Sequence, residues 1–179
     1  LWPVCLATRA AFNQRSPINT LSIPNLASTG GWTIGREPNG YVYFNTVDAV
    51  PMTGAQEAMV LEVAKTAFRP CCDNSTFYQD CNHGSALLGL LELAASQGVT
   101  KGGLYEIALT ANSFWFPDYY VRTALYFVHF HKRSWRSLLP KRVIGRKFSS
   151  LSGWEKNVDA PLRRANVRLP GEGGDQKEC

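Results

Sequence analysis

The sequence predicts a mainly α-helical fold, a small antiparallel bundle of about four helices with a long irregular N-terminal arm and a basic C-terminal extension. Three observations support this. Apolar residues recur at helical spacing between residues 53 and 131. Glycine or proline marks the ends of these segments, and short connections favour antiparallel neighbours. The 179 residues, 45% of them hydrophobic, are enough to bury a core.

Residues 1–52 are expected to form an extended arm. They contain five prolines and no sustained helical period. Residues 41–47 have strand-like composition, but one strand makes no sheet. No acidic residue occurs before Glu37, and such a composition resembles the remnant of a targeting peptide.

The core domain is expected to span residues 53–131. Thr53 and Gln56 have the spacing of a capping box at the start of the first helix, which Pro70 ends. The other three helices are expected at about Asn82 to Ser96, Gly102 to Phe116 and Pro117 to His131. The second of the four is apolar nearly all round, so we expect it to be central and buried. Its stripe of small or polar residues is expected to face another helix at close range; the stripe consists of Ser85, Gly89, Glu92 and Ser96.

Residues 132–179 are predicted to be a basic flank followed by a loose tail. The chain has a net charge of +5, yet residues 119–154 carry eight basic residues and no acidic one. This asymmetry predicts an anionic partner: an acidic protein, anionic lipid headgroups or RNA. The candidate residues of this basic face are Lys132, Arg133, Arg136, Lys141, Arg142, Arg146 and Lys147. Trp154 is expected to pack back on the helices.

Three of the five cysteines and one of the three histidines lie between residues 71 and 83. We expect a disulfide staple here, between Cys81 and either Cys71 or Cys72. Closing a loop of about ten residues would stabilise the fold by about 2–3 kcal/mol. Such a bond needs an oxidising compartment, so the predicted location is extracytoplasmic or organellar: secreted, periplasmic, mitochondrial or in a plastid lumen.

Two cofactor alternatives remain for the same segment. Thiolate and imidazole suit zinc and softer metals, so Cys71, Cys72, Cys81 and His83 could complete a tetrahedral site. Their spacing matches none of the common zinc, haem or iron–sulfur patterns. A second alternative is a haem held by His83 and His131, if both histidines face inward from neighbouring helices.

A thiol enzyme is the third alternative. Cys81 precedes an expected helix start, where backbone amides lower the pKa of a thiol, and His83 could act as its base. The chain has no phosphate-binding P-loop, dinucleotide fingerprint or nucleophile elbow. It also has no apolar run near the roughly 18–20 residues of a membrane span. The first expectation is therefore a non-catalytic accessory subunit that binds other protein subunits of a larger assembly.

Overall fold

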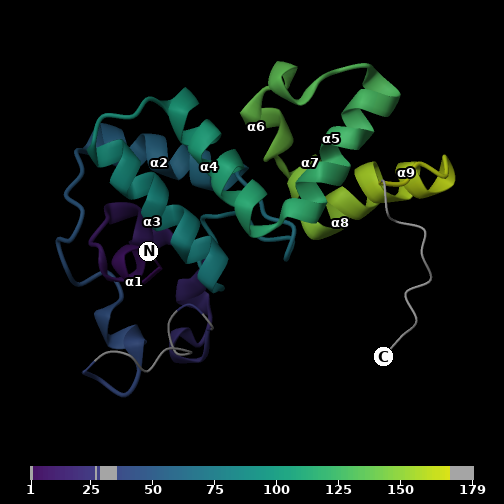
Figure 1. Ribbon diagram of the computed structural model, residues 1–179. Coiled ribbons are helices and arrows are strands. Elements are labelled where there is room, and N and C mark those ends of the chain that lie inside the picture. Colours follow the sequence, from purple (N-terminus) through teal and green to yellow (C-terminus); the bar gives the residue numbers. More distant parts are fainter. Residues whose placement is uncertain (1, 27, 29–35, 170–179) are drawn as a thin grey trace.

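The computed structural model describes residues 2–26, 28 and 36–169, which form a mainly helical protein (Figure 1). Within these residues, extended pairing is limited to two isolated bridges, Thr8 with Val47 and Phe68 with Ser75. None of the helices formed by these residues combines the length and the apolar composition that crossing a bilayer requires.

From α3 onward the helices follow one another with short connections, whereas residues 8–53 separate α1 from α2 and residues 67–81 separate α2 from α3. Their bounds are α1 Trp2–Ala7, α2 Gly54–Thr66, α3 Asn82–Ser96, α4 Lys101–Trp115, α5 Pro117–His131, α6 Pro140–Val143, α7 Arg146–Ser149, α8 Leu151–Trp154 and α9 Ala160–Arg164. A π-helical turn, Glu155–Asp159, joins α8 to α9. Short 3₁₀ turns lie at Ala11–Arg15, Pro17–Thr20, Ile23–Asn25, Gly40–Tyr43 and Trp135–Ser137.

The four helices expected between residues 53 and 131 are confirmed as α2 to α5. The capping box is present at the start of α2. The Thr53 hydroxyl accepts from the Gln56 amide at 3.3 Å, and Gln56 Oε1 accepts from the Thr53 amide at 2.8 Å. These local signals satisfy backbone donors that a helix start otherwise leaves open.

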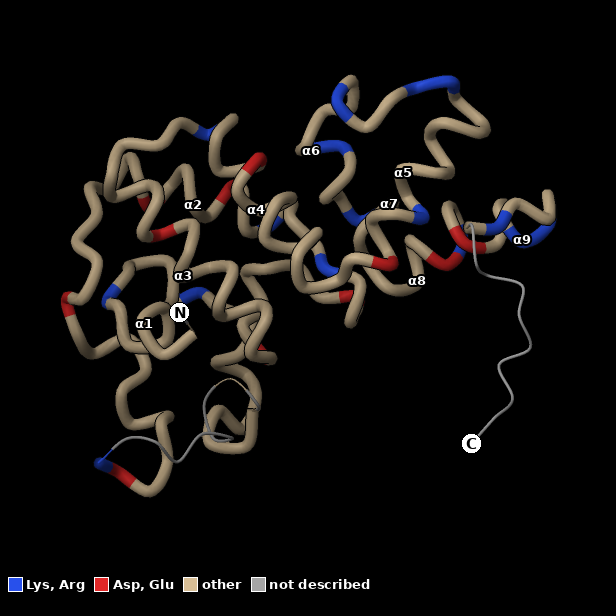
Figure 2. Tube along the Cα trace, viewed as in Figure 1, with Lys and Arg blue, Asp and Glu red and all other residues tan. Residues whose placement is uncertain are grey.

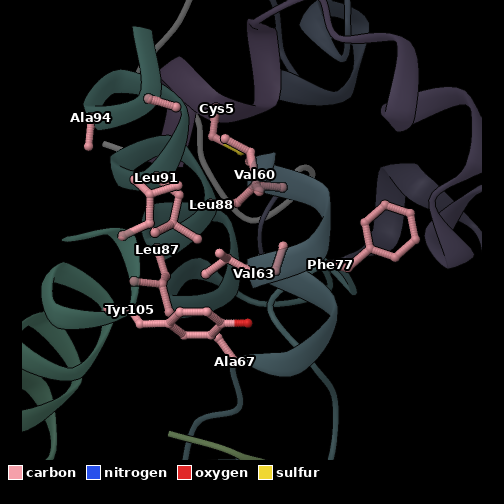
Figure 3. Packing of buried hydrophobic residues seen from close by; sticks show 14 of the residues in the cluster. Cys5, Val60, Val63, Ala67, Phe77, Leu87, Leu88, Leu91, Ala94 and Tyr105 are labelled. Carbon is pink, nitrogen blue, oxygen red and sulfur yellow. The ribbon is translucent and has the colours of Figure 1, made fainter. Parts of the chain in front are cut away.

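The first hydrophobic core lies among α1, α2, α3 and α4 (Figure 3). Leu87, Leu88 and Leu91 of α3 are fully buried in it, which confirms the expected central position of this helix. Val60 and Val63 of α2 pack against them.

The predicted extended N-terminal arm is wrong, because the described N-terminal residues form α1 and several 3₁₀ turns. α1 packs along α3, and its Cys5 and Leu6 are fully buried. The Cys5 thiol interacts with the backbone of Gly89 and with the side chain of Glu92, so α1 approaches α3 at these two residues of the small and polar stripe. A helix this short has no stability of its own, and packing on α3 supplies it. The strand-like residues 41–47 form a 3₁₀ turn and a single bridge.

A second core extends the fold beyond residue 131, so the predicted end of the helical core domain at residue 131 is corrected. Leu109 of α4 and apolar residues of α5 to α9 form this core, among them Phe127, Phe148 and Leu162. Trp154 docks as expected: its indole lies 4.5 Å from the Tyr119 ring. The predicted four-helix bundle is thus replaced by two cores that meet at α4, with α5–α9 beside α1–α4 (Figure 1). The predicted loose tail begins after Leu162, but α9 continues to Arg164, and the Asn166 and Val167 amides bond back to this helix. Residues from 170 onward lie outside the described residues.

Candidate metal centre

The cysteine and histidine cluster is built on the connection between α2 and α3, which backbone hydrogen bonds hold in place. The Phe68 amide donates to the Ile144 carbonyl at 2.8 Å, and the Thr76 amide donates to the Ala67 carbonyl at 2.8 Å. The Leu151 amide at the start of α8 donates to the Cys72 carbonyl at 3.0 Å. The loop therefore contacts both halves of the protein.

Arg69 is the centre of this loop, and its side chain is fully buried. Its guanidinium donates to the carbonyls of Asn74, Ser75 and Tyr78 at 3.1–3.4 Å. It also donates to Asp80 Oδ1 at 3.0 Å, and its Nε donates to the Cys81 sulfur at 3.2 Å. All five donors of the side chain are used, so the loop folds around a satisfied buried cation.

The start of α3 is capped by sulfur. Cys81 is the N-cap residue, with extended backbone angles, and its Sγ accepts from the Gly84 amide at 3.4 Å. Gly84 leaves room for the guanidinium, because a Cβ at this position would lie 2.7 Å from Arg69 Nη2.

Cys71, Cys81 and His83 converge on one point. One ligand atom of each lies within 4.8 Å of the other two. Cys71 and His83 are exposed and Cys81 is half-buried, so the cluster opens to solvent. The His83 ring contacts the rings of Trp115 and Phe116, with centroids 5.7 and 4.9 Å apart.

The three thiols influence one another's ionisation, and the pKa of Cys81 shifts in the opposite direction to those of Cys71 and Cys72. Hydrogen bonds from Cys71 and Cys72, the Arg69 guanidinium and the Gly84 amide lower the pKa of Cys81 well below its usual range, against the effect of burial. Hydrogen bonds to Cys72 and Cys81, together with burial, raise the pKa of Cys71. For Cys72, the hydrogen bond with Cys71 lowers the pKa, but the hydrogen bond with Cys81 and burial outweigh it. These shifts favour the thiolate form at Cys81 over the other two cysteines.

The predicted disulfide staple is not supported. Cys71, Cys72 and Cys81 are free thiols, and so is Cys5. The Cys81 sulfur accepts from Arg69 Nε and from the Gly84 amide, and it is not covalently bonded to another sulfur. Cys5 is fully buried, and its thiol donates to Gln79 Oε1 at 3.5 Å.

His131 does not join the cluster. His83 lies against Phe116, at the residue before α5, whereas His131 is the last residue of α5. Fifteen helical residues separate the two places by roughly 22 Å. His131 is exposed and its Nε2 lies 3.1 Å from the Tyr126 hydroxyl. The expected pair of inward histidines for a haem does not form.

The seven residues of the basic face are all exposed, and within the described chain none of them forms an ion pair. Basic residues gather along α6, α7 and the connection that precedes α6 (Figure 2). Four of them cover aromatic rings at 5.2–5.9 Å: Lys141, Arg142, Arg146 and Lys147. The basic face is therefore partly a packing surface.

Arg69, Asp80 and Gly84 are parts of the site that sequence reasoning missed. An arginine beside a proline and a glycine in a helix start carry no local signal of burial or of mutual contact. The cluster and the capping cysteine, in contrast, were visible as a dense group of ligand-type residues before an apolar helix.

The fold and the site together define a two-core helical protein with a surface thiol–imidazole cluster backed by a buried arginine. In comparisons with known proteins, no family model, no curated protein and no solved structure matches the chain.

Proposed function

We propose that this chain is a metal-binding domain in which Cys71, Cys81 and His83 hold one zinc-class ion. The observation that carries the proposal is the convergence of their ligand atoms to within 4.8 Å of one another. With Zn–S bonds of about 2.3 Å, a tetrahedral ion keeps two sulfur ligands about 3.8 Å apart. Rotation of side chains covers the remaining difference.

Cys72 is the candidate for the fourth ligand because it is the chain neighbour of Cys71; it lies outside the group of three whose ligand atoms converge. Three thiolates and one imidazole around Zn²⁺ carry one net negative charge. The buried Arg69 guanidinium, which already donates to the Cys81 sulfur at 3.2 Å, offsets that charge. Arginine in this place is an outer partner of the kind that orients metal ligands.

The role that suits the position is structural. The loop that carries Cys71 and Cys72 is bonded to the start of α8, where Asp73 Oδ1 accepts from the Ser152 amide at 2.9 Å and from its hydroxyl at 2.8 Å. An ion that also holds Cys81 and His83 would tie this loop to the start of α3. At a free concentration 100 times its Kd, such an ion stabilises the folded state by about 2.7 kcal/mol.

The test is a titration of the full-length, fully reduced protein with Co²⁺ and then Zn²⁺ without oxygen. Tetrahedral thiolate coordination of Co²⁺ gives visible absorption bands, which Zn²⁺ should remove at a stoichiometry of one. Removal of a direct ligand should weaken metal binding by more than about 100-fold, which is more than the loss of a residue that only supports a ligand costs. The variants to measure are Cys71→Ser, Cys81→Ser and His83→Asn. His129→Asn is the matched control, since His129 is exposed on α5 and outside the cluster.

Absence of stoichiometric binding, or equal affinity of the three ligand variants and the control, would contradict the proposal. A thiol enzyme centred on Cys81 makes the opposite prediction: no bound ion, and fast single-site alkylation that Cys81→Ser abolishes. Cys72→Ser distinguishes a site with three protein ligands from a site with four. This substitution should change the Co²⁺ spectrum only if Cys72 is a ligand.

A second candidate function, binding of an anionic partner in an assembly, rests on the exposure of the basic face without ion pairs among the described residues. Lys132, Arg133 and Arg136 precede α6 and cover no aromatic ring among the described contacts. Replacing Arg133 and Arg136 by Gln should weaken retention on a poly-glutamate column and lower the salt needed for elution. Arg9→Gln is the control, and equal elution of both variants would refute this role. The accessory role itself and the location of the protein stay predictions.

A further inference from the structure

A cavity of about 470 Å³ lies beside α5 and α9, well along the chain from the cysteine cluster. Its walls include three arginines: Arg122 from α5, Arg163 from α9 and Arg168 after α9. Asn166 and Val167 complete the described wall. The volume falls within the range of about 300–1,000 Å³ that is common for small-molecule sites.

Two of the arginines are fixed by one carboxylate. Asp159 Oδ1 accepts from Arg122 Nη2 at 2.6 Å, and Asp159 Oδ2 accepts from Arg163 Nε at 2.6 Å. The Arg122 guanidinium also lies over the Trp154 ring, 6.0 Å from its centroid. Asp159 ends the π-helical turn Glu155–Asp159, and turns of this kind are frequent at functional sites. The guanidinium groups are therefore held in place before any ligand arrives.

The third arginine is brought back to the cavity by the end of α9. Asn166 adopts a left-handed conformation with φ of 51°, and its amide donates to the Arg163 carbonyl at 3.0 Å. The Val167 amide donates to the Leu162 carbonyl at 3.0 Å. This pair of bonds is a Schellman motif, which reverses the chain at a helix end. The reversal returns Arg168 to the same cavity as Arg163.

We infer that this cavity binds the phosphate group of a small phosphorylated molecule. A guanidinium presents a planar fork of donors that matches phosphate oxygens, and charge-assisted bonds of this type are the strong ones. Arg168 is exposed and forms no ion pair within the described part of the chain, so it is available to a ligand. Asp159 fixes Arg122 and Arg163, and the cavity is larger than a phosphate alone, which leaves space for the organic part.

The test uses the full-length protein and inorganic phosphate as the first probe, at constant ionic strength set with chloride. Binding is followed through the arginine Nε–H signals in NMR spectra. A saturable shift of the Arg163 signal is expected, and Arg163→Gln and Arg168→Gln should each weaken binding about 10-fold or more. Arg164→Gln is the matched control, because Arg164 is an exposed neighbour on α9 that does not line the cavity.

A second arm identifies the source of the phosphate. Tighter binding of glycerol phosphate than of inorganic phosphate supports the inference. Preference for inorganic phosphate alone, or for vesicles that contain phosphatidic acid over glycerol phosphate, overturns the small-molecule assignment. The proposed site is wrong if the arginine signals show no saturable shift, or if Arg164→Gln weakens phosphate binding as much as the cavity variants do. Cys81→Ser should bind phosphate like the wild type, so failure here is distinguishable from failure of the metal proposal.

Discussion

Glu92 is a carboxyl group in the first hydrophobic core, on the face of α3 that α1 covers. Its side chain is fully buried, and among the described residues neither oxygen has a well-formed hydrogen-bond partner. Burial raises the pKa of Glu92 well above its usual value; the Cys5 side chain lowers it, and the nearby Glu57 raises it further. We therefore expect the folded protein to keep the Glu92 proton above the pH at which the unfolded chain loses it, and Glu92→Gln to mimic the protonated state.

The magnitude follows from proton linkage. Above about pH 4.3 the unfolded chain has lost the Glu92 proton, while the folded chain retains it until its raised pKa is reached. In this window the folded state binds one more proton, so the free energy of unfolding falls by about 1.4 kcal/mol per pH unit. Glu92→Gln cannot lose a proton at this position. Its advantage over the wild type should therefore grow with pH, by as much as about 2.7 kcal/mol between pH 5 and pH 7.

Urea unfolding at pH 5, 6 and 7, followed by circular dichroism, measures this difference. Glu106→Gln is the matched control, because Glu106 is an exposed carboxylate on α4. The gap between Glu92→Gln and the wild type should widen with pH, and by more than the gap for the control. A gap for Glu92→Gln that is the same at all three pH values would show that Glu92 ionises normally in the fold.

Three further predictions concern buried polar contacts, each measured by urea unfolding. Gly84→Ala should destabilise by about 1–3 kcal/mol, because its Cβ would meet the immobile Arg69 guanidinium at 2.7 Å; Gly102→Ala, whose Cβ meets nothing nearer than 3.9 Å, should not. Arg69→Lys should cost about 3 kcal/mol or more, since one ammonium cannot satisfy the partners of five donors; a cost below about 1 kcal/mol would refute the central role of this side chain. Tyr120→Phe should cost about 1–2 kcal/mol, because it removes the hydrogen bond between the Tyr120 hydroxyl and Ser149 at 2.8 Å. This hydroxyl is buried, and its burial raises the pKa of Tyr120 to about 12. An unchanged stability would show that the bond contributes nothing.

The helices from α2 to α5 could be predicted because residues next to their ends determine where they begin and stop. Thr53 with Gln56 begins α2, Pro70 follows its end, and Pro117 begins α5. Each signal acts on backbone groups within a few residues, so it needs no knowledge of the rest of the fold. The dense group of cysteines likewise marked the position of the candidate site, although it favoured a disulfide.

The remaining features depend on contacts between distant residues. α1 has six residues, and α6 to α8 have four each, too few for a helical period to be read. The burial of Arg69 depends on carbonyls that only the folded loop directs at it. His83 and His131 are far apart because His83 of α3 packs against Phe116 at the start of α5, whereas His131 is the last residue of α5, and a helical wheel does not show this.

Because both cores include residues of α4, the protein cannot be divided into two fragments that fold separately. Leu104 and Ala108 of α4 belong to the first core, and Leu109, the next residue, belongs to the second. No cut in the sequence leaves both cores intact, because each would lose one wall or keep an apolar face in water. We expect a single calorimetric transition with equal van't Hoff and calorimetric enthalpies. Fragments ending at residue 131 or beginning at residue 117 should be insoluble, and the intact chain is the smallest unit in which either proposed site can be assayed.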